Sequence, residues 1–140
     1  MAKAKVNLNL DHVLVKVRGA TDAALEAIAL QIEGVTRVNI QRNGQIDTGF
    51  MVNSVYSVSK RSTTYGDTRG SGTQTNRQGQ GVLRKIAPPA NLPSHASAAV
   101  AVGAEYAIFQ ELKKPFLFPA AETVAGYAEG TAEKVYKEMI

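Results

Sequence analysis

The sequence contains no cysteine and only two histidines. Without cysteine, neither a disulfide framework nor a thiolate metal site can form. His12 and His95 have no cluster of His, Cys or carboxylate residues around them at metal-ligand spacing. No apolar run approaches the length of a membrane span, and the first residues lack the apolar core and cleavage site of a signal peptide. We therefore expect a protein without a metal, a cofactor or a membrane anchor.

The positive charge of the chain is concentrated in one segment. The net charge is +4 over 140 residues, a length that fits a single domain spanning residues 1–140. Residues 60–97 carry six basic residues against Asp67 alone, whereas the rest of the chain has ten basic and eleven acidic residues. The segment is also rich in Gly, Ser, Thr, Gln and Pro, which predicts a long loop that is flexible or ordered by a partner.

The first third of the chain combines two apolar patterns. Residues 12–19 alternate valines with other residues, which predicts a half-buried strand ended by Gly19. Beyond it, Thr21 or Asp22 can cap a helix whose apolar residues recur at helical spacing as Leu25, Ile28, Ala29 and Ile32. After Gly34 the β-branched residues allow two interpretations, a hairpin turning at Asn43-Gly44 or a helix that continues. We choose a helix that reaches about Arg42, with Gly34 costing it about 1 kcal/mol relative to Ala.

The remaining elements complete an α+β prediction. Strands are indicated around Val55, Tyr56 and Val58 and again around Val100 and Val102. A last helix follows, with Pro119 at a first helical position and an apolar face formed by Ala121, Val124, Ala128, Val135 and Met139. The expected fold is a long helix and a C-terminal helix packed on a small antiparallel sheet, with one long basic loop.

The stretch "KKPFLFPAAE", residues 113–122, places three large apolar residues between two prolines. Proline cannot donate to a sheet ladder, so a central strand is disfavoured here. Pro115 and Pro119 restrict the backbone at low entropic cost. We expect them to present Phe116 and Phe118 as anchors for the core or for a neighbouring molecule.

The stretch "IDTGF", residues 46–50, resembles the Asp-Thr-Gly loop of aspartic proteases, in which two such loops share a proton. A single copy would require a homodimer. Phe50 stands where those enzymes have a small residue, and Gln45 breaks the apolar strand that should precede the loop. A structural turn, in which Asp47 bonds the backbone two residues on, is the favoured interpretation.

Two further features indicate contact with other molecules. Gly126 and Gly130 are four residues apart on the predicted last helix. The spacing indicates either a weak helix or a face that another subunit's backbone can approach closely. The basic loop could bind phosphate or an acidic protein surface, although only Tyr65 is available there for base stacking. The candidate contacts are Arg69, Arg77, Arg84 and Lys85.

The order of these motifs resembles the neck and tail-completion proteins of siphophages, which include putative tail components and head-tail joining proteins. A short strand and a long helix match "VKVRGATDAALEAIALQI", and an Asp-Thr-Gly-hydrophobic motif followed by Ser matches "DTGFMVNSV". A Tyr-Ala motif with a following aromatic residue and Glu matches "EYAIFQE", and the Pro-Phe-Leu-x-Pro-Ala motif before the last helix matches "KPFLFPAAE". The resemblance covers nearly the whole chain except residues 60–97, and here only three residues separate Glu111 from Pro115.

The resemblance implies a structural virion protein, not an enzyme. Copies would assemble in the host cytoplasm into a ring, a hexamer or a dodecamer, in the neck between head and tail. Its partners would be connector or head-closure proteins and tail-terminator or tail-tube proteins, with non-specific contact with DNA in the lumen. A tail-terminator ring and a nucleic-acid-binding protein that uses the basic loop are the alternatives. Together, the resemblance and the features described above give these candidate structural or interface residues: Asp47, Gly49, Phe50, Tyr106, Pro115, Phe116, Phe118, Pro119, Gly126 and Gly130.

Overall fold

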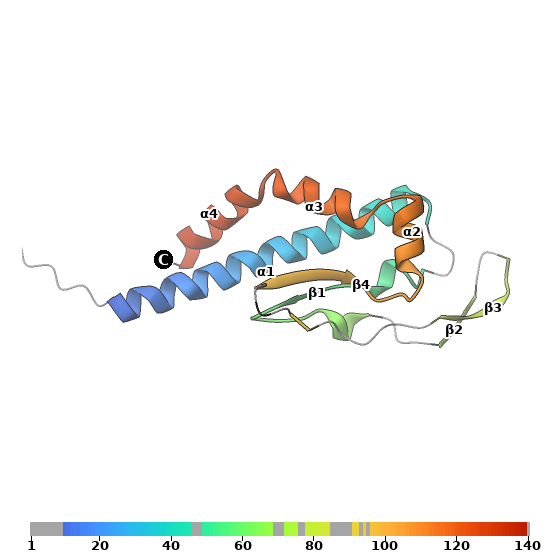
Figure 1. Cartoon of the computed structure of the whole chain (residues 1–140), viewed down its shortest axis with the longest axis horizontal. Helices are drawn as coiled ribbons and strands as arrows, with labels where there is room; N and C mark the ends of the chain where they lie inside the picture. The colour runs from blue at the N-terminus through green and yellow to red at the C-terminus, as the bar shows by residue number, and fades with distance from the viewer. Residues whose placement is uncertain are drawn as a thin grey trace, which may run out of the picture.

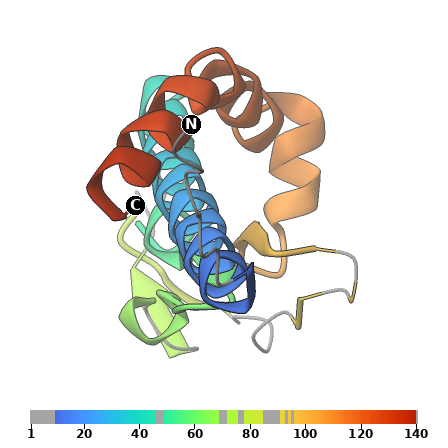
Figure 2. The same cartoon turned by 90° about the vertical axis from the view of Figure 1, so that its left-hand side faces the viewer.

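The computed structural model describes residues 10–45, 49–68, 72–75, 78–84, 91–92, 94 and 96–139. One long helix, α1, forms the middle layer of the molecule (Figure 1). A small antiparallel sheet lies on one side of this helix, and the C-terminal helices α3 and α4 lie along the other (Figures 1 and 2). The predicted α+β class, with a long helix and a C-terminal helix, is confirmed.

Helix α1 spans Leu10–Arg42, so the strand predicted over residues 12–19 is wrong. Val15 and Val17 are exposed, whereas Ala20 is fully buried, so these two valines do not face a sheet. Gly19 does not end the helix, because a lone glycine costs a helix only about 1 kcal/mol.

The predicted end of α1 near Arg42 is confirmed, and a C-capping motif explains it. The amide of Gly44 donates to the carbonyl of Gln41 at 3.0 Å, and that of Gln45 donates to Ile40 at 3.1 Å. This Schellman arrangement needs a left-handed residue, which Gly44 provides with φ of +70°. Asn43-Gly44 is therefore a helix end, not a hairpin turn.

The sheet consists of β1, Val55–Ser59, and β4, Ala98–Val102, both near the predicted positions. They pair antiparallel, with Val55 opposite Val102. Helix α1 covers one face. Tyr56 of β1 contacts Tyr65 edge to face, with the two ring centroids 5.0 Å apart. Two 3₁₀ turns flank this strand, η1 at Val52–Ser54 and η2 at Tyr65–Asp67.

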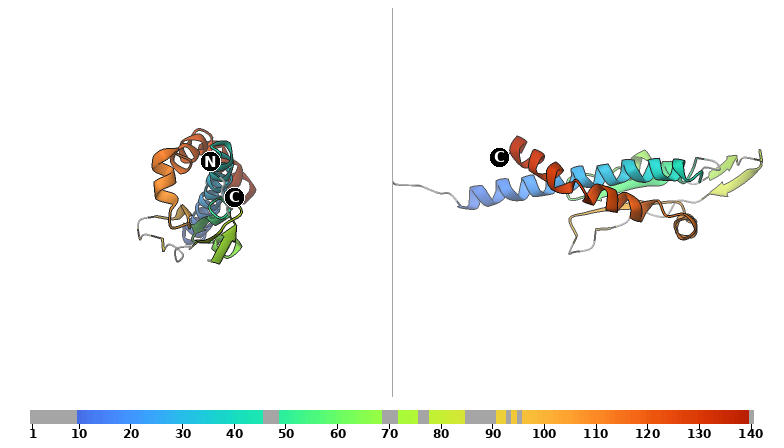
Figure 3. Two further views of the ribbon diagram at one scale, coloured as in Figure 1. Left: turned by 90° about the vertical axis from the view of Figure 1, so that its right-hand side faces the viewer. Right: turned by 90° about the horizontal axis from the view of Figure 1, so that it is seen from above.

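Within the basic segment, β2, Gly72–Thr75, pairs antiparallel with β3, Gly81–Arg84. This hairpin projects beyond the end of the molecule that carries α2, away from α1 and the sheet (Figures 1 and 3). Neither sequence periodicity nor a two-residue turn signal predicted the two strands. Whether the segment is ordered by a partner remains a prediction.

Three helices follow the sheet: α2, Ala107–Lys113; α3, Leu117–Ala125; and α4, Ala128–Met139. The single last helix expected from the sequence is divided at Gly126, which caps α3. Helices α3 and α4 both pack on α1. Thr131 donates to Gln31 at 3.1 Å, and the hydroxyls of Tyr136 and Thr21 are hydrogen-bonded, so α4 is tied to α1 along its length. In the described part of the chain, no helix combines the length and apolar character needed to cross a membrane.

The main core lies where the C-terminal end of α1, the sheet and the α2–α3 turn meet. Its largest fully buried side chains include Phe50, Phe116, Ile40 and Val55. At about 25 cal/mol per Å² of apolar surface, each phenylalanine stabilises the fold by about 3 kcal/mol or more. The core therefore joins three segments that are far apart in the sequence.

Candidate interaction surface

The α2–α3 turn separates the two phenylalanines of the proline-bracketed stretch. Phe116 is 1% exposed and packs in the core, whereas Phe118, in the first turn of α3, is 67% exposed. Pro115 is exposed. Pro119 lies at the third residue of α3, not the first, within the first turn where no intrahelical donor is required. The turn thus anchors one aromatic side chain and presents the other.

Glu111 of α2 fixes the beginning of α3. Its carboxylate accepts hydrogen bonds from the backbone amides of Phe116 at 2.9 Å, Leu117 at 3.0 Å and Phe118 at 3.1 Å. These are donors that the first turn of a helix leaves without intrahelical partners. A negative charge is also favoured at a helix N-terminus. The carboxylate therefore takes the place of an N-cap side chain, which Phe116 cannot supply.

Three side-chain amides, one in the last turn of α1 and two just after the helix, donate hydrogen bonds to the backbone carbonyls of the α2–α3 turn and to Gln110. Asn39 donates to the carbonyl of Phe116 at 3.0 Å, and Asn43 donates to that of Pro115 at 3.0 Å. Gln45 donates to the carbonyls of Gln110 and Lys114 at 3.0 and 3.2 Å. The backbone of the turn is consequently bonded from both sides, and its position relative to α1 is fixed.

Helix α2 presents an apolar ridge to solvent. We use this name for Ile108, Phe109 and Leu112 of α2 together with Phe118 of α3, whose exposed fractions are 65%, 64%, 78% and 67%. Single exposed apolar residues are common on protein surfaces, whereas large contiguous apolar patches mark sites of contact with other molecules. Four such side chains lie on two successive helices, which makes the ridge a candidate interaction surface.

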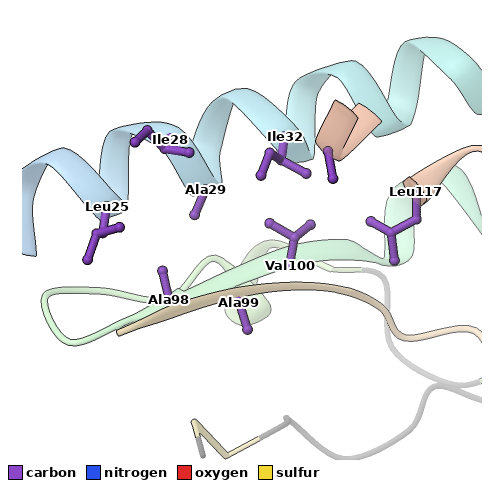
Figure 4. A pocket seen from close by; sticks show the side chains of 9 residues that line it. Leu25, Ile28, Ala29, Ile32, Ala98, Ala99, Val100 and Leu117 are labelled. Atoms are coloured by element: carbon purple, nitrogen blue, oxygen red, sulfur yellow. The ribbon is translucent and has the colours of Figure 1, made fainter. Parts of the chain in front are cut away.

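An apolar groove lies between α1, β4 and α3 (Figure 4). Figure 4 shows Ile32 of α1 and Val100 of β4 facing one another across it, with Leu117 at one end. Its volume is about 290 Å³. A second pocket of about 220 Å³ shares Leu117 and reaches Ile108, so the groove continues toward the ridge. The groove is lined by Leu25, Ile28, Ala29, Ile32, Ala98, Ala99, Val100, Leu117 and Ala121.

Residues of the Asp-Thr-Gly-Phe motif that the structure describes have structural positions. Gly49 has φ of +79°, a conformation that glycine adopts most readily. Phe50 is fully buried in the core. The buried hydroxyl of Ser54 donates to Met51 at 2.7 Å and accepts from the amide of Ala104 at 3.1 Å, which ties the motif to the residues after β4.

The other predicted interface residues are dispersed. Tyr106 is half-buried against the core before α2. A Cβ atom at Gly126 would meet the Thr123 carbonyl oxygen at 3.3 Å, whereas one at Gly130 would meet no atom within 4 Å. Gly126 follows the end of α3, whereas Gly130 lies in α4, which begins at Ala128. The two glycines therefore do not form one helical face, and the close approach at Gly126 is to its own chain.

Some predicted residues cannot be placed. Asp47, Arg69, Arg77 and Lys85 lie outside the described residues. Arg84 ends β3, and the structure describes its backbone only. Among the residues that the structure does describe, no group of three His, Asp or Glu side chains is placed to hold a metal ion.

Sequence reasoning missed α2 and the roles of Glu111 and Ile108. The spacing of Ile108 and Leu112, four residues apart, was a signal for one helical face. The capping role of Glu111 had no local signal, because its acceptor contacts cross from one helix to the next.

Comparisons with protein families, curated proteins and solved structures gave no match for this chain.

Proposed function

We propose that this chain is a structural protein of a phage virion, which forms a ring in the neck and joins the head to the tail. The order of sequence motifs along the chain supports the assignment. The observation that carries the need for a partner is the exposed apolar ridge, which lies beside an apolar groove on the same chain.

The ridge has the area expected of an interface core. Four side chains that each expose about two-thirds of their surface present roughly 400–700 Å² of apolar area, since a large apolar side chain has about 150–250 Å². A stable interface buries about 800 Å² on each partner. The ridge alone supplies about half or more of the area that one partner contributes.

The ridge side chains and the residues that line the main groove are different sets of residues, so a contact between the ridge of one copy and the groove of a second would be heterologous. Such contacts close into rings when the rotation between subunits permits. A hexamer or a dodecamer in the neck, or a ring that terminates the tail, fulfils this arrangement. Connector, head-closure, tail-terminator or tail-tube proteins would then contact the two faces of the ring.

The mass of the purified chain tests the proposal directly. We expect native mass spectrometry and negative-stain images to show a closed ring, either for the chain alone or after its addition to purified heads or tails. A chain that stays monomeric up to high concentration and binds neither particle would contradict the proposal.

Binding of nucleic acid through the hairpin is a second candidate, supported by its projection from the body and the basic residues around it. Phosphate contact would give affinity for arbitrary duplex DNA that falls steeply as salt is raised. We favour subunit contact, because a neck that DNA must traverse functions better without strong adhesion to DNA. Salt-dependent retention on duplex DNA by the free chain would reverse this preference.

A further inference from the structure

In the described part of the chain, the outer edge of β4 has no strand partner. β4 pairs with β1 and with no other described strand. Just outside the paired strands, the amide of Lys60 donates to Ser97 at 3.3 Å and that of Gly103 donates to Ser54 at 2.9 Å. Hydrogen-bonded pairs alternate along an antiparallel ladder. The residues that bond β1 are therefore Ala99 and Ala101, and those whose N–H and C=O groups face outward are Ala98, Val100 and Val102.

The β4 strand itself carries no charged residue, proline or bulge that would block the addition of another strand. Natural edge strands are blunted by charged residues, proline or bulges. The five residues Ala98–Val102 are alanines and valines that pair with β1 without interruption. An unprotected edge of this kind is a template for another strand.

The apolar groove lies above the same strand. Val100 faces α1 from β4 in Figure 4. Successive side chains of a strand point to opposite faces. A strand added at the outer edge of β4 would therefore send every second side chain toward the α1 side, where the groove can receive it.

The β2–β3 hairpin of the same chain would also be stabilised by pairing with a further strand. It consists of two four-residue strands, and an isolated two-stranded hairpin is at best marginally stable in water. It points away from its own sheet and cannot reach it in this arrangement (Figures 1 and 3). Both the hairpin and β4 would gain backbone hydrogen bonds if the hairpin of one copy met β4 of the next.

We propose that β3 of one copy adds to the outer edge of β4 in a second copy and extends the sheet across the subunit contact. This inference rests on the proposed ring and specifies how neighbouring copies hold one another. β3 is favoured over β2 because it contains the adjacent apolar residues Val82 and Leu83, one of which lies on the groove side in either register. Charge also fits, because the hairpin segment is basic and the exposed Glu105 lies just beyond β4.

Proline substitutions at two adjacent positions of β4 distinguish the role of its outer edge from that of the edge that pairs with β1. Val100→Pro removes an outward N–H and leaves the bonds to β1 in place, and proline is tolerated on the solvent side of an edge strand. Ala101→Pro removes a bond to β1 and should lower the melting temperature. Val100→Ile keeps the N–H group and serves as the side-chain control.

Val100 is partly buried against the core, so we expect Val100→Pro to melt somewhat below the wild type but above Ala101→Pro. It should need at least about tenfold more protein for half-assembly, which corresponds to a loss of about 1.4 kcal/mol of association free energy. Val100→Ile should assemble like the wild type. Assembly by a folded Val100→Pro variant at wild-type concentrations would overturn the proposal.

Cross-linking provides a measurement that does not depend on the proline variant. The chain lacks cysteine, so single cysteines report defined pairs. Copies with Ala101→Cys are mixed with mass-tagged copies that carry Val82→Cys or Leu83→Cys and are joined by a short bis-maleimide. Lys137→Cys on α4 replaces the hairpin cysteine in the control.

We expect mixed dimers that contain the hairpin cysteine and few with the α4 control. Rings that form without this cross-link, or that link Ala101→Cys only to itself, would overturn the strand addition and leave the proposed ring intact. A chain that never self-associates would contradict both.

Discussion

The carboxylate of Glu111 accepts a hydrogen bond from the backbone amide of Phe116 at 2.9 Å. The bond joins the end of α2 to the beginning of α3 and places the Phe116 side chain in the core while Phe118 faces solvent. The same contact thus fixes both the core anchor and part of the exposed ridge.

Glu111→Ala should destabilise the protein by about 1–2 kcal/mol, because backbone amides of α3 lose their acceptor. Glu111→Gln retains an acceptor oxygen and should cost less. Glu122→Ala, an exposed position on α3, is the control and should change stability by less than about 0.5 kcal/mol. Urea unfolding measures all three, and equal midpoints for Glu111→Ala and Glu122→Ala would refute the capping role.

The two phenylalanines should respond in opposite ways. Phe116→Ala opens a cavity in the core and should lower the free energy of unfolding by about 3–5 kcal/mol. Phe118→Ala should leave stability within about 0.5 kcal/mol of the wild type and weaken assembly. Thermal melting and native mass measured on both variants check this. If Phe118→Ala alters neither melting nor assembly, the ridge is not an interface.

Gly34→Ala should stabilise the protein by about 0.5–1 kcal/mol. Gly34 lies within α1, is exposed, and a Cβ atom there would meet nothing within 4 Å, so alanine gains helix propensity without a clash. Gly44→Ala is the control with the opposite sign, because its φ of +70° costs other residues about 1–2 kcal/mol. A destabilised Gly34→Ala variant would mean that this face of α1 needs glycine for another reason.

Sequence periodicity predicted α1 where its apolar residues are half-buried along the groove and failed where Val15 and Val17 are exposed. Ile28 and Ile32 repeat at helical spacing, and the helix was predicted to its correct end. The alternation of Val13, Val15 and Val17 is typical of a strand, yet β-branched residues cost a helix only about 0.5 kcal/mol each, so α1 continues through them.

The candidate site was only partly predictable. Phe116 and Phe118 were identified as anchors from the flanking prolines, but their different environments depend on tertiary contacts of Glu111 and Asn39. The edge of β4 had no sequence signal, because which strands pair, and on which side, is decided by packing between segments far apart in the chain.

Asp47→Asn should have no effect on catalysis, because we expect the chain to have no peptidase activity. The neighbouring Phe50 is buried in the core, and Gly49 adopts a positive φ in a turn. Both positions fit a structural motif. Peptide-cleavage assays over acidic and neutral pH, with thermal melting of both proteins, check this. Cleavage by the wild type that Asp47→Asn abolishes would establish an aspartic protease instead.

Residues 60–97 should gain protection from amide exchange when copies assemble. The segment contains five glycines, three prolines and few large apolar residues. On its own it therefore buries too little apolar surface to offset the entropy lost on ordering. The gain should be largest at the amides of β3, Gly81–Arg84, where a neighbouring β4 would accept them. Thr64 supplies an internal control, since its amide already donates to Ser57 at 3.0 Å within one chain. Hydrogen exchange is measured at the β3 amides and at the Thr64 amide, both in free chains and in assembled rings. Equal and strong protection of β3 in both states would show that the hairpin is stable without a neighbour, and that neither a subunit nor DNA is needed to order it.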